Sequence, residues 1–234
     1  DASATSVGSV DTAGTISADA GFSIMTYTGV SGQQTIAHGL GAVPKMIMVK
    51  NLDSSENWRV YHHSIGAGAY LKLNDSATKT DDTGPFSNTT PTSTLITMGG
   101  DDGTMHGSEA HVAYIFAEKQ GYSKIGKYVG NGNADGTFVY TGFRPAYLLY
   151  KNVDTADEFF IHDNKRSGYN DENEYLFASI DQAEGTQNRI RFTTNGFKAL
   201  NSDKGVNKDG DTYVYLAIAE MPFVNSKGVP GNAR

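Results

Sequence analysis

Short apolar runs separated by turn residues dominate the chain. Met46–Val49 and Tyr147–Tyr150 are unbroken apolar runs that are flanked by Pro and by Lys-Asn. Such runs predict strands that are covered on both faces, as in a sandwich core. Two longer runs, His111–Ala117 and Tyr213–Ala219, are rich in aromatic and β-branched residues and predict two more strands.

Two further segments alternate with a period of two residues. Arg189–Thr193 and Tyr70–Asn74 both do so, which predicts half-exposed strands. Asp-Gly and Asn-Gly pairs, the preferred hairpin turns, occur throughout the chain. No window of 12 residues or more sustains the 3.6-residue period of a helix. We therefore expect an all-β fold with little helix.

The chain repeats itself at an offset of 100 to 102 residues. Five anchors keep their order, and the small drift in register fits insertions in turns. The matched segments are Gly21–Ser23 with Gly121–Ser123, Tyr27–Gly29 with Tyr128–Gly130, Pro44–Asn51 with Pro145–Asn152, Trp58–His62 with Phe159–Asp163, and Val112–Glu118 with Val214–Glu220.

This repeat predicts two tandem homologous lobes that arose by internal duplication. The period exceeds that of a solenoid unit, so each copy is expected to be a small domain of its own. We expect jelly-roll-like β-sandwich lobes over residues 21–120 and 121–234. Residues 1–20 are rich in small and polar residues, and they form either a linker or an N-terminal arm that adds a strand to a neighbour. The relative orientation of the lobes is left open.

Charge and composition exclude several classes of protein. The net charge is −7, with no clustered Lys and Arg, so we expect neither nucleic-acid binding nor attraction to an anionic membrane. No apolar run approaches the ~20 residues that span a bilayer, so membrane insertion is not expected. The chain starts at Asp1 without a signal-peptide pattern, which suggests a processed product or a piece of a longer protein.

Metal binding and cofactor use find little support. The chain has no cysteine, and adjacent His62 and His63 would point to opposite faces of a strand. We expect the six histidines to lie in loops or on the surface: His38, His62, His63, His106, His111 and His162. Asn207–Asp211 resembles a Ca²⁺ loop but lacks the following bidentate Glu, so a hairpin turn is the preferred interpretation.

Catalysis is not predicted either. The chain has no nucleophile elbow and no glycine-rich phosphate loop. Glu118 and Glu220 are a matched pair of carboxylates, and paired carboxylates can hydrolyse glycosides. Because residues matched between copies usually share a structural role, we expect both to mark the end of the last strand. We expect the protein not to be an enzyme.

Aromatic residues offer the best candidates for binding, because Tyr and Trp stack on sugars and anchor interfaces. Those on predicted strands are expected in the core: Trp58, Tyr147, Tyr150, Tyr213 and Tyr215. Four others are candidate ligand-binding residues on the surface: Tyr61, Tyr140, Tyr169 and Tyr175.

Several motifs resemble a repeat domain of unknown function from structural proteins of tailed bacteriophages, notably marine phages and cyanophages. The resemblance covers residues 21–234 and is loosest over residues 76–94 and 164–188. It is carried by Gly21–Ile24, Tyr27–Gly29, His38–Asn51, Ala113–Glu118, Gly121–Lys124, Asn131–Gly136, Tyr140–Ala146 and Asn232–Arg234.

The resemblance implies a virion protein. One hypothesis is a module of a tail fibre or appendage that binds host-surface glycan or protein, assembles with other virion proteins and forms a homo-oligomer, with a trimer as the first expectation. A second is a purely structural head-decoration or fibre-spacer protein, and a third is a polysaccharide depolymerase. The resemblance carries over no catalytic residue.

Overall fold

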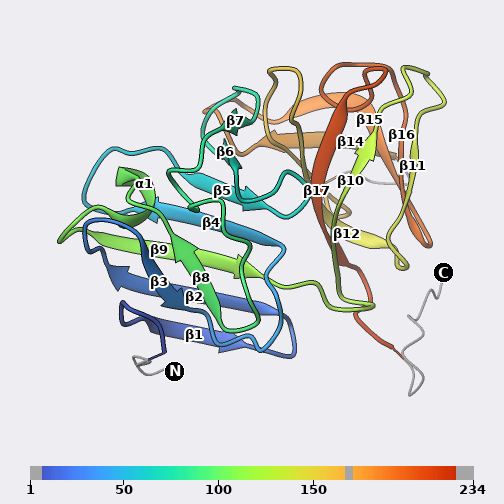
Figure 1. The fold of residues 1–234 in the computed structure, drawn as a ribbon. Helices are drawn as coiled ribbons and strands as arrows, with labels where there is room; N and C mark the ends of the chain where they lie inside the picture. The colour runs from blue at the N-terminus through green and yellow to red at the C-terminus, as the bar shows by residue number, and fades with distance from the viewer. Residues whose placement is uncertain (1–6, 167–170, 225–234) are drawn as a thin grey trace. The chain divides into compact units, whose positions relative to one another are not determined.

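The computed structural model describes residues 7–166 and 171–224, which form seventeen strands and one four-residue helix, α1 (Asp102–Met105) (Figure 1). The prediction of an all-β fold with little helix is confirmed. The helix is far too short to cross a membrane. The chain divides into two compact units. Unit 1 runs to Asn74 and resumes over Lys79–Glu118, and unit 2 comprises Asp75–Thr78 and the residues from Lys119 onward.

Unit 1 has two layers. A seven-stranded sheet carries its strands in the order β1-β2-β9-β4-β5-β6-β7, and β3 pairs with β8 in a separate two-stranded sheet. Apolar side chains of both sheets share one core cluster. The strands are β1 (Ala13–Ser17), β2 (Phe22–Thr28), β3 (Gln34–Ala37), β4 (Met46–Asn51), β5 (Arg59–His62), β6 (Ala69–Lys72), β7 (Thr80–Asp81), β8 (Leu95–Met98) and β9 (Ala110–Phe116).

Unit 2 is built from one eight-stranded sheet in the order β10-β17-β12-β13-β14-β15-β16-β11. The sheet curls on itself, because Tyr128 near one end meets Phe197 near the other at a ring distance of 5.8 Å in the core. The strands are β10 (Ser123–Val129), β11 (Phe138–Tyr140), β12 (Pro145–Asn152), β13 (Phe160–Asp163), β14 (Asp171–Phe177), β15 (Gly185–Thr193), β16 (Gly196–Ala199) and β17 (Thr212–Ala219).

The two units use the same strand order. In unit 1 the order β2-β9-β4-β5-β6-β7 stands beside the pair β3-β8, and in unit 2 the order β10-β17-β12-β13-β14-β15 leads into the pair β16-β11. The described strands differ in two respects: β1 has no counterpart in the sheet of unit 2, and β7 and β15 differ in length. β7 has two residues, whereas β15 has nine and connects β14 to β16. The long β15 therefore joins in unit 2 what remain two separate sheets in unit 1.

Matched polar residues tie the strands to the loops in the same way in both units. The side-chain amide of Asn51 donates to the carbonyl oxygen of Asp102 at 2.9 Å, and that of Asn152 donates to the carbonyl of Lys204 at 2.8 Å. Each asparagine also accepts two backbone N–H groups through Oδ1, from the turn that follows its strand. Both asparagines are fully buried, so these bonds satisfy groups that water does not reach.

An N-terminal arm, residues 7–12, precedes β1 and covers the outer edge of β3. The N–H groups of Ser9 and Val10 donate to the carbonyl oxygen of Thr35, and the Thr12 hydroxyl donates to that of Ala37. Val10 forms a parallel bridge with Ile36 and is buried in the core of unit 1. Residues 7–12 thus form an arm that pairs with unit 1 of its own chain. The strand that follows, β1, adds to the seven-stranded sheet beside β2.

A strand does form at Ala69–Lys72, but the expectation that the strand over Tyr70–Asn74 is half-exposed is wrong for this strand. Tyr70 and Leu71 are 6% and 1% exposed, although they point to opposite faces of β6. Tyr70 belongs to the core of unit 1, where the guanidinium of Arg59 lies 5.2 Å from the centre of its ring. Leu71, on the other face of β6, is buried as well, so neither face of this strand is open to solvent at these positions.

Replacing either matched asparagine tests the equivalence of the units. Asn51→Ala and Asn152→Ala each remove the side-chain partner of two backbone donors in the following turn and of one loop carbonyl, so each is expected to lower the free energy of unfolding by about 2–4 kcal/mol. Chemical denaturation of the full chain measures the loss, and hydrogen exchange locates it in the unit that carries the change. The exposed Asn188→Ala is the control, with no measurable loss expected. A loss below 1 kcal/mol at Asn51 or Asn152 contradicts the assigned role.

Candidate functional site

The matched carboxylates are held in ion pairs at the ends of their strands. Glu118 lies 3.0 Å from the ammonium of Lys45, and Glu220 lies 3.1 Å from Nε of Arg144. Lys45 precedes β4 and Arg144 precedes β12, so each pair joins the end of the last strand to the start of the central one. This arrangement supports a shared structural role for both carboxylates.

The expectation that the histidines lie on the surface or in loops is wrong for three of the six: His62, His111 and His162 are buried in strands, whereas His38, His63 and His106 lie in loops. Four histidines have no exposed surface: His38, His62, His111 and His162. His111 stacks on Tyr27 with 5.1 Å between ring centres, and burial lowers its pKa and that of His38. In the described residues no group of three or more His, Asp or Glu side chains is placed to hold a metal ion.

The segment Asn207–Asp211 forms a turn. Asn207 is buried, and its side-chain amide donates to Asn131 Oδ1 and to the carbonyl of Asn133, both at 2.8 Å. Gly210 has a φ of 75°, which a glycine adopts without strain. Both acceptor oxygens of Asn131 and Asn133 are thus engaged by an amide N–H donor.

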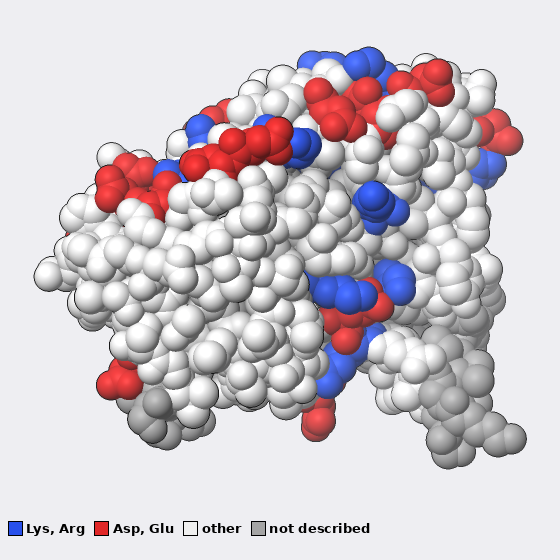
Figure 2. Space-filling model, viewed as in Figure 1, with Lys and Arg blue, Asp and Glu red and all other residues white. Residues whose placement is uncertain are grey.

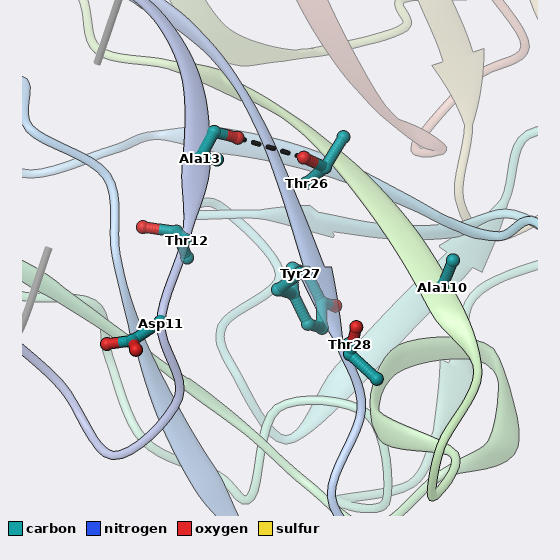
Figure 3. A pocket seen from close by; sticks show the side chains of 7 residues that line it. All are labelled: Asp11, Thr12, Ala13, Thr26, Tyr27, Thr28 and Ala110. Carbon is teal, nitrogen blue, oxygen red and sulfur yellow. Dashed lines mark hydrogen bonds between the residues drawn. The ribbon is translucent and has the colours of Figure 1, made fainter. Parts of the chain in front are cut away.

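A groove of about 340 Å³ opens in unit 1 where the arm passes from β3 into β1, beside the end of β2 (Figure 3). Its lining consists of Asp11, Thr12, Ala13, Thr26, Tyr27, Thr28 and Ala110. Most of its hydroxyl protons are already used: Thr12 donates to Ala37, Thr26 donates to Ala13, and Tyr27 donates to the carbonyl of Thr104 at 2.6 Å. Among the lining residues Asp11 is the charged one, so the groove offers weak hydrogen bonding and no paired acid and base.

The four aromatic candidates for ligand binding differ in how far the structure exposes them. Tyr61 is 1% exposed and packs on Phe86, so its expected surface position is wrong. Tyr175 is half-buried against the core of unit 2, with Arg189 5.1 Å from its ring centre. Tyr169 lies outside the described residues. Tyr140 is 63% exposed and remains a candidate ligand-binding residue.

The aromatics expected in the core mostly lie there. Tyr150, Tyr213 and Tyr215 are at most 4% exposed, whereas Trp58 and Tyr147 are half-buried. Trp58 precedes β5 and packs on Tyr114 at 5.9 Å between ring centres. Burial raises the pKa of Tyr147 to about 12.

Tyr140 has a neighbour that the sequence analysis missed. Phe138 is 46% exposed and lies two residues away on β11, so both rings stand on the same side of this strand. They pair across to Lys198 and Gly196 of β16. We call these four residues the β11 face. The short aromatic and β-branched run Phe138-Val139-Tyr140, which follows the pair Asp135-Gly136 after one residue, was the available signal in the sequence.

A glycine lies next to each ring, and the contact is tight at Gly196. A Cβ added at Gly196 would meet the Phe138 ring at 3.1 Å, and one added at Gly142 would lie 3.7 Å from the Tyr140 hydroxyl. Gly142 also has a φ of 86°, which favours glycine. The rings therefore rest on bare backbone with part of their surface open to solvent. Such rings can stack on the apolar face of a ligand.

Charged groups form the rim of the β11 face. Lys198 forms an ion pair with Asp135, and this contact lowers the pKa of the Asp135 carboxyl. Arg191 is exposed on β15 opposite Lys198. On the face of the molecule drawn in Figure 2, charged side chains occur in small groups between wide uncharged areas. The β11 face thus combines two aromatic rings with hydrogen-bonding groups of both signs.

One family model matches the chain. It carries the description "Domain of unknown function (DUF7483)" and covers residues 1–222. Comparison with curated proteins and with solved structures finds no match.

The burial of His111 makes stability depend on pH. Its pKa lies below the ordinary value of 6.5 in the folded protein. Folding therefore disfavours its charged form, so its contribution is intact above pH 6.5 and is lost as the pH falls below it. Unit 2 carries Tyr213 at the matched position. His111→Tyr is expected to reduce the loss of stability between pH 6.5 and 4.5, measured by denaturation at each pH.

The exposed His63→Gln supplies the control for this measurement, and its pH profile is expected to match that of the unchanged chain. A profile of His111→Tyr that overlays the unchanged one contradicts the role of His111.

Proposed function

The chain belongs to the DUF7483 family of domains of unknown function, and we propose that it is a non-catalytic attachment module of a phage virion. In this proposal it forms part of a tail fibre or appendage, and it holds host-surface glycan on the β11 face. The virion setting rests on the sequence resemblance, and the binding role rests on the exposed aromatic pair.

The exposed pair Phe138 and Tyr140 is the observation that carries the binding role. Two large aromatic side chains with about half of their surface open to water are costly unless a partner covers them. Rings on adjacent same-side positions of a strand stand about 7 Å apart. They offer successive sugar rings a stacking surface, while Lys198 and Asp135 supply a hydrogen-bond donor and acceptor at its rim.

A non-catalytic role is supported by the use of the matched polar residues. Glu118 and Glu220 both hold strand ends together through cationic partners. We also infer that the units are homologous, jelly-roll-like β-sandwich lobes from an internal duplication. The shared strand order and the matched contacts of Asn51 and Asn152 support this inference.

A single face of this size binds weakly, so attachment requires several copies. Linking weak sites raises the overall avidity by about 10²–10⁴-fold without new contacts. We therefore propose a homo-oligomer, a trimer first, bound to other virion proteins. The position equivalent to Tyr140 in unit 1 is Ala37, which the arm covers, so the proposal assigns one such face to each chain.

Binding of the full chain to a glycan array, followed by saturation-transfer NMR with the selected glycan, tests the proposal. Phe138→Ala and Tyr140→Ala are each expected to weaken binding about tenfold, equivalent to 1.4 kcal/mol. Neither change is expected to alter the unfolding midpoint by much, because both rings are exposed.

The exposed Leu52→Ala in unit 1 is the matched control and should bind glycan as the unchanged chain does. Absence of binding to glycans and to host cells, with retained incorporation into particles, overturns the attachment role in favour of a spacer or decoration protein. Release of reducing ends from host polysaccharide, lost in Glu118→Gln or Glu220→Gln, overturns the non-catalytic role.

A further inference from the structure

The backbone of β11 presents hydrogen-bonding groups along its outer edge. The carbonyl of Thr137 accepts from the N–H of Ala199, and the N–H of Thr141 donates to Asn195. In an antiparallel pair, alternate residues point their backbone groups toward the partner strand and away from it. Thr137 and Thr141 point toward β16, so Phe138 and Tyr140 point their N–H and C=O groups outward. No strand in the described parts of the chain pairs with that edge.

The equivalent edge in unit 1 is covered. There the backbone N–H of His38 donates to the carbonyl of Thr94, so His38 points its backbone groups toward β8, as Thr141 points its own toward β16. Thr35 and Ala37 therefore point outward, as Phe138 and Tyr140 do on β11. The arm satisfies both: Thr35 accepts from the N–H groups of the arm and donates its own N–H to Ser9 Oγ at 2.7 Å, and Ala37 accepts from Thr12.

The arm shows what kind of segment such an edge takes. It runs parallel to β3, and it contributes one buried apolar side chain, Val10, which is 7% exposed. On either side of Val10 it carries short polar residues, and Ser9 and Thr12 bond to the backbone of β3. The requirements are thus an extended backbone, one small apolar anchor and short hydroxyl side chains.

We propose that the outer edge of β11 docks an extended peptide strand of a partner protein, parallel to β11 and with the chemistry of this arm. Backbone pairing of this kind is a general mode of peptide recognition, in which main-chain hydrogen bonds supply the affinity and side-chain pockets supply the specificity. The exposed rings of Phe138 and Tyr140 would flank the docked strand.

A partner protein fits this edge better than the arm of a second copy. Each arm is tethered beside its own β3 edge, and a short tether gives an effective concentration of about millimolar. The arm also buries Val10 in the core of its own unit. A second copy would have to give up those contacts to reach β11, whereas a separate segment docks without that loss.

Titration of the isotope-labelled full chain with a synthetic peptide of residues 7–17 tests the proposal. The amides of Phe138 and Tyr140 are expected to shift on addition of peptide, and their hydrogen exchange is expected to slow at least tenfold at saturation. Two variants separate the backbone edge from the rings. Phe138→Pro removes the outward N–H and is therefore expected to abolish docking. The fold is expected to survive this change, because Pro is tolerated on an edge strand. Phe138→Ala keeps the N–H and should retain docking within a few-fold.

The same pair distinguishes this proposal from glycan binding, because both variants lose the ring on which a sugar would stack. Unchanged amides of Phe138 and Tyr140 at millimolar peptide overturn the proposal, as does equal peptide binding by Phe138→Pro and the unchanged chain. Reversible self-association of the full chain in sedimentation, abolished by deletion of residues 1–12, assigns the edge to a second copy and overturns the partner-protein version.

Discussion

The backbone at strand edges is the constraint on which both units depend. Every N–H and C=O that a sheet leaves unpaired must find another partner or water, and an open edge invites association. Unit 1 meets this constraint with its own N-terminal arm, which pairs with β3, and with β1, which pairs with β2. In unit 2 no strand of the described residues pairs with the outer edge of β11, which lies beside two exposed rings. The units differ most where one edge is covered and the other is open.

Comparison of the units separates the residues of the fold from those of the surface. Tyr27 and Tyr128 both donate from a buried hydroxyl to a loop carbonyl, of Thr104 and Val206 respectively. Contacts that recur in this way hold strands to loops. Arg59 has no arginine at the matched position of β13, yet Arg189 of β15 supplies an equivalent pair with Asp203. The fold thus preserves the interaction even where the residue moves to another strand.

The sequence predicted the strands better than the surface. The runs that begin at Met46 and Tyr147 became β4 and β12, because local apolar content decides whether a strand is buried. The sequence pattern placed Tyr61 on the surface, because nothing nearby in the sequence reveals Phe86. Phe86 lies in a loop and packs against Tyr61 of β5. Ser76 lies in the first half of the sequence but accepts the N–H of Asp157 within unit 2. Such contacts depend on tertiary packing, which periodicity does not encode.

One short strand carries both proposed activities, and strand geometry keeps them apart. Side chains stand perpendicular to a sheet, whereas backbone N–H and C=O groups lie in its plane. The rings of Phe138 and Tyr140 would therefore contact a ligand above the sheet, while their peptide groups would form hydrogen bonds with a strand beside it. Both can be occupied together, and a docked strand would place its own side chains next to the rings. A partner on the edge would then enlarge the surface that a glycan meets, which couples assembly to attachment without movement of the core.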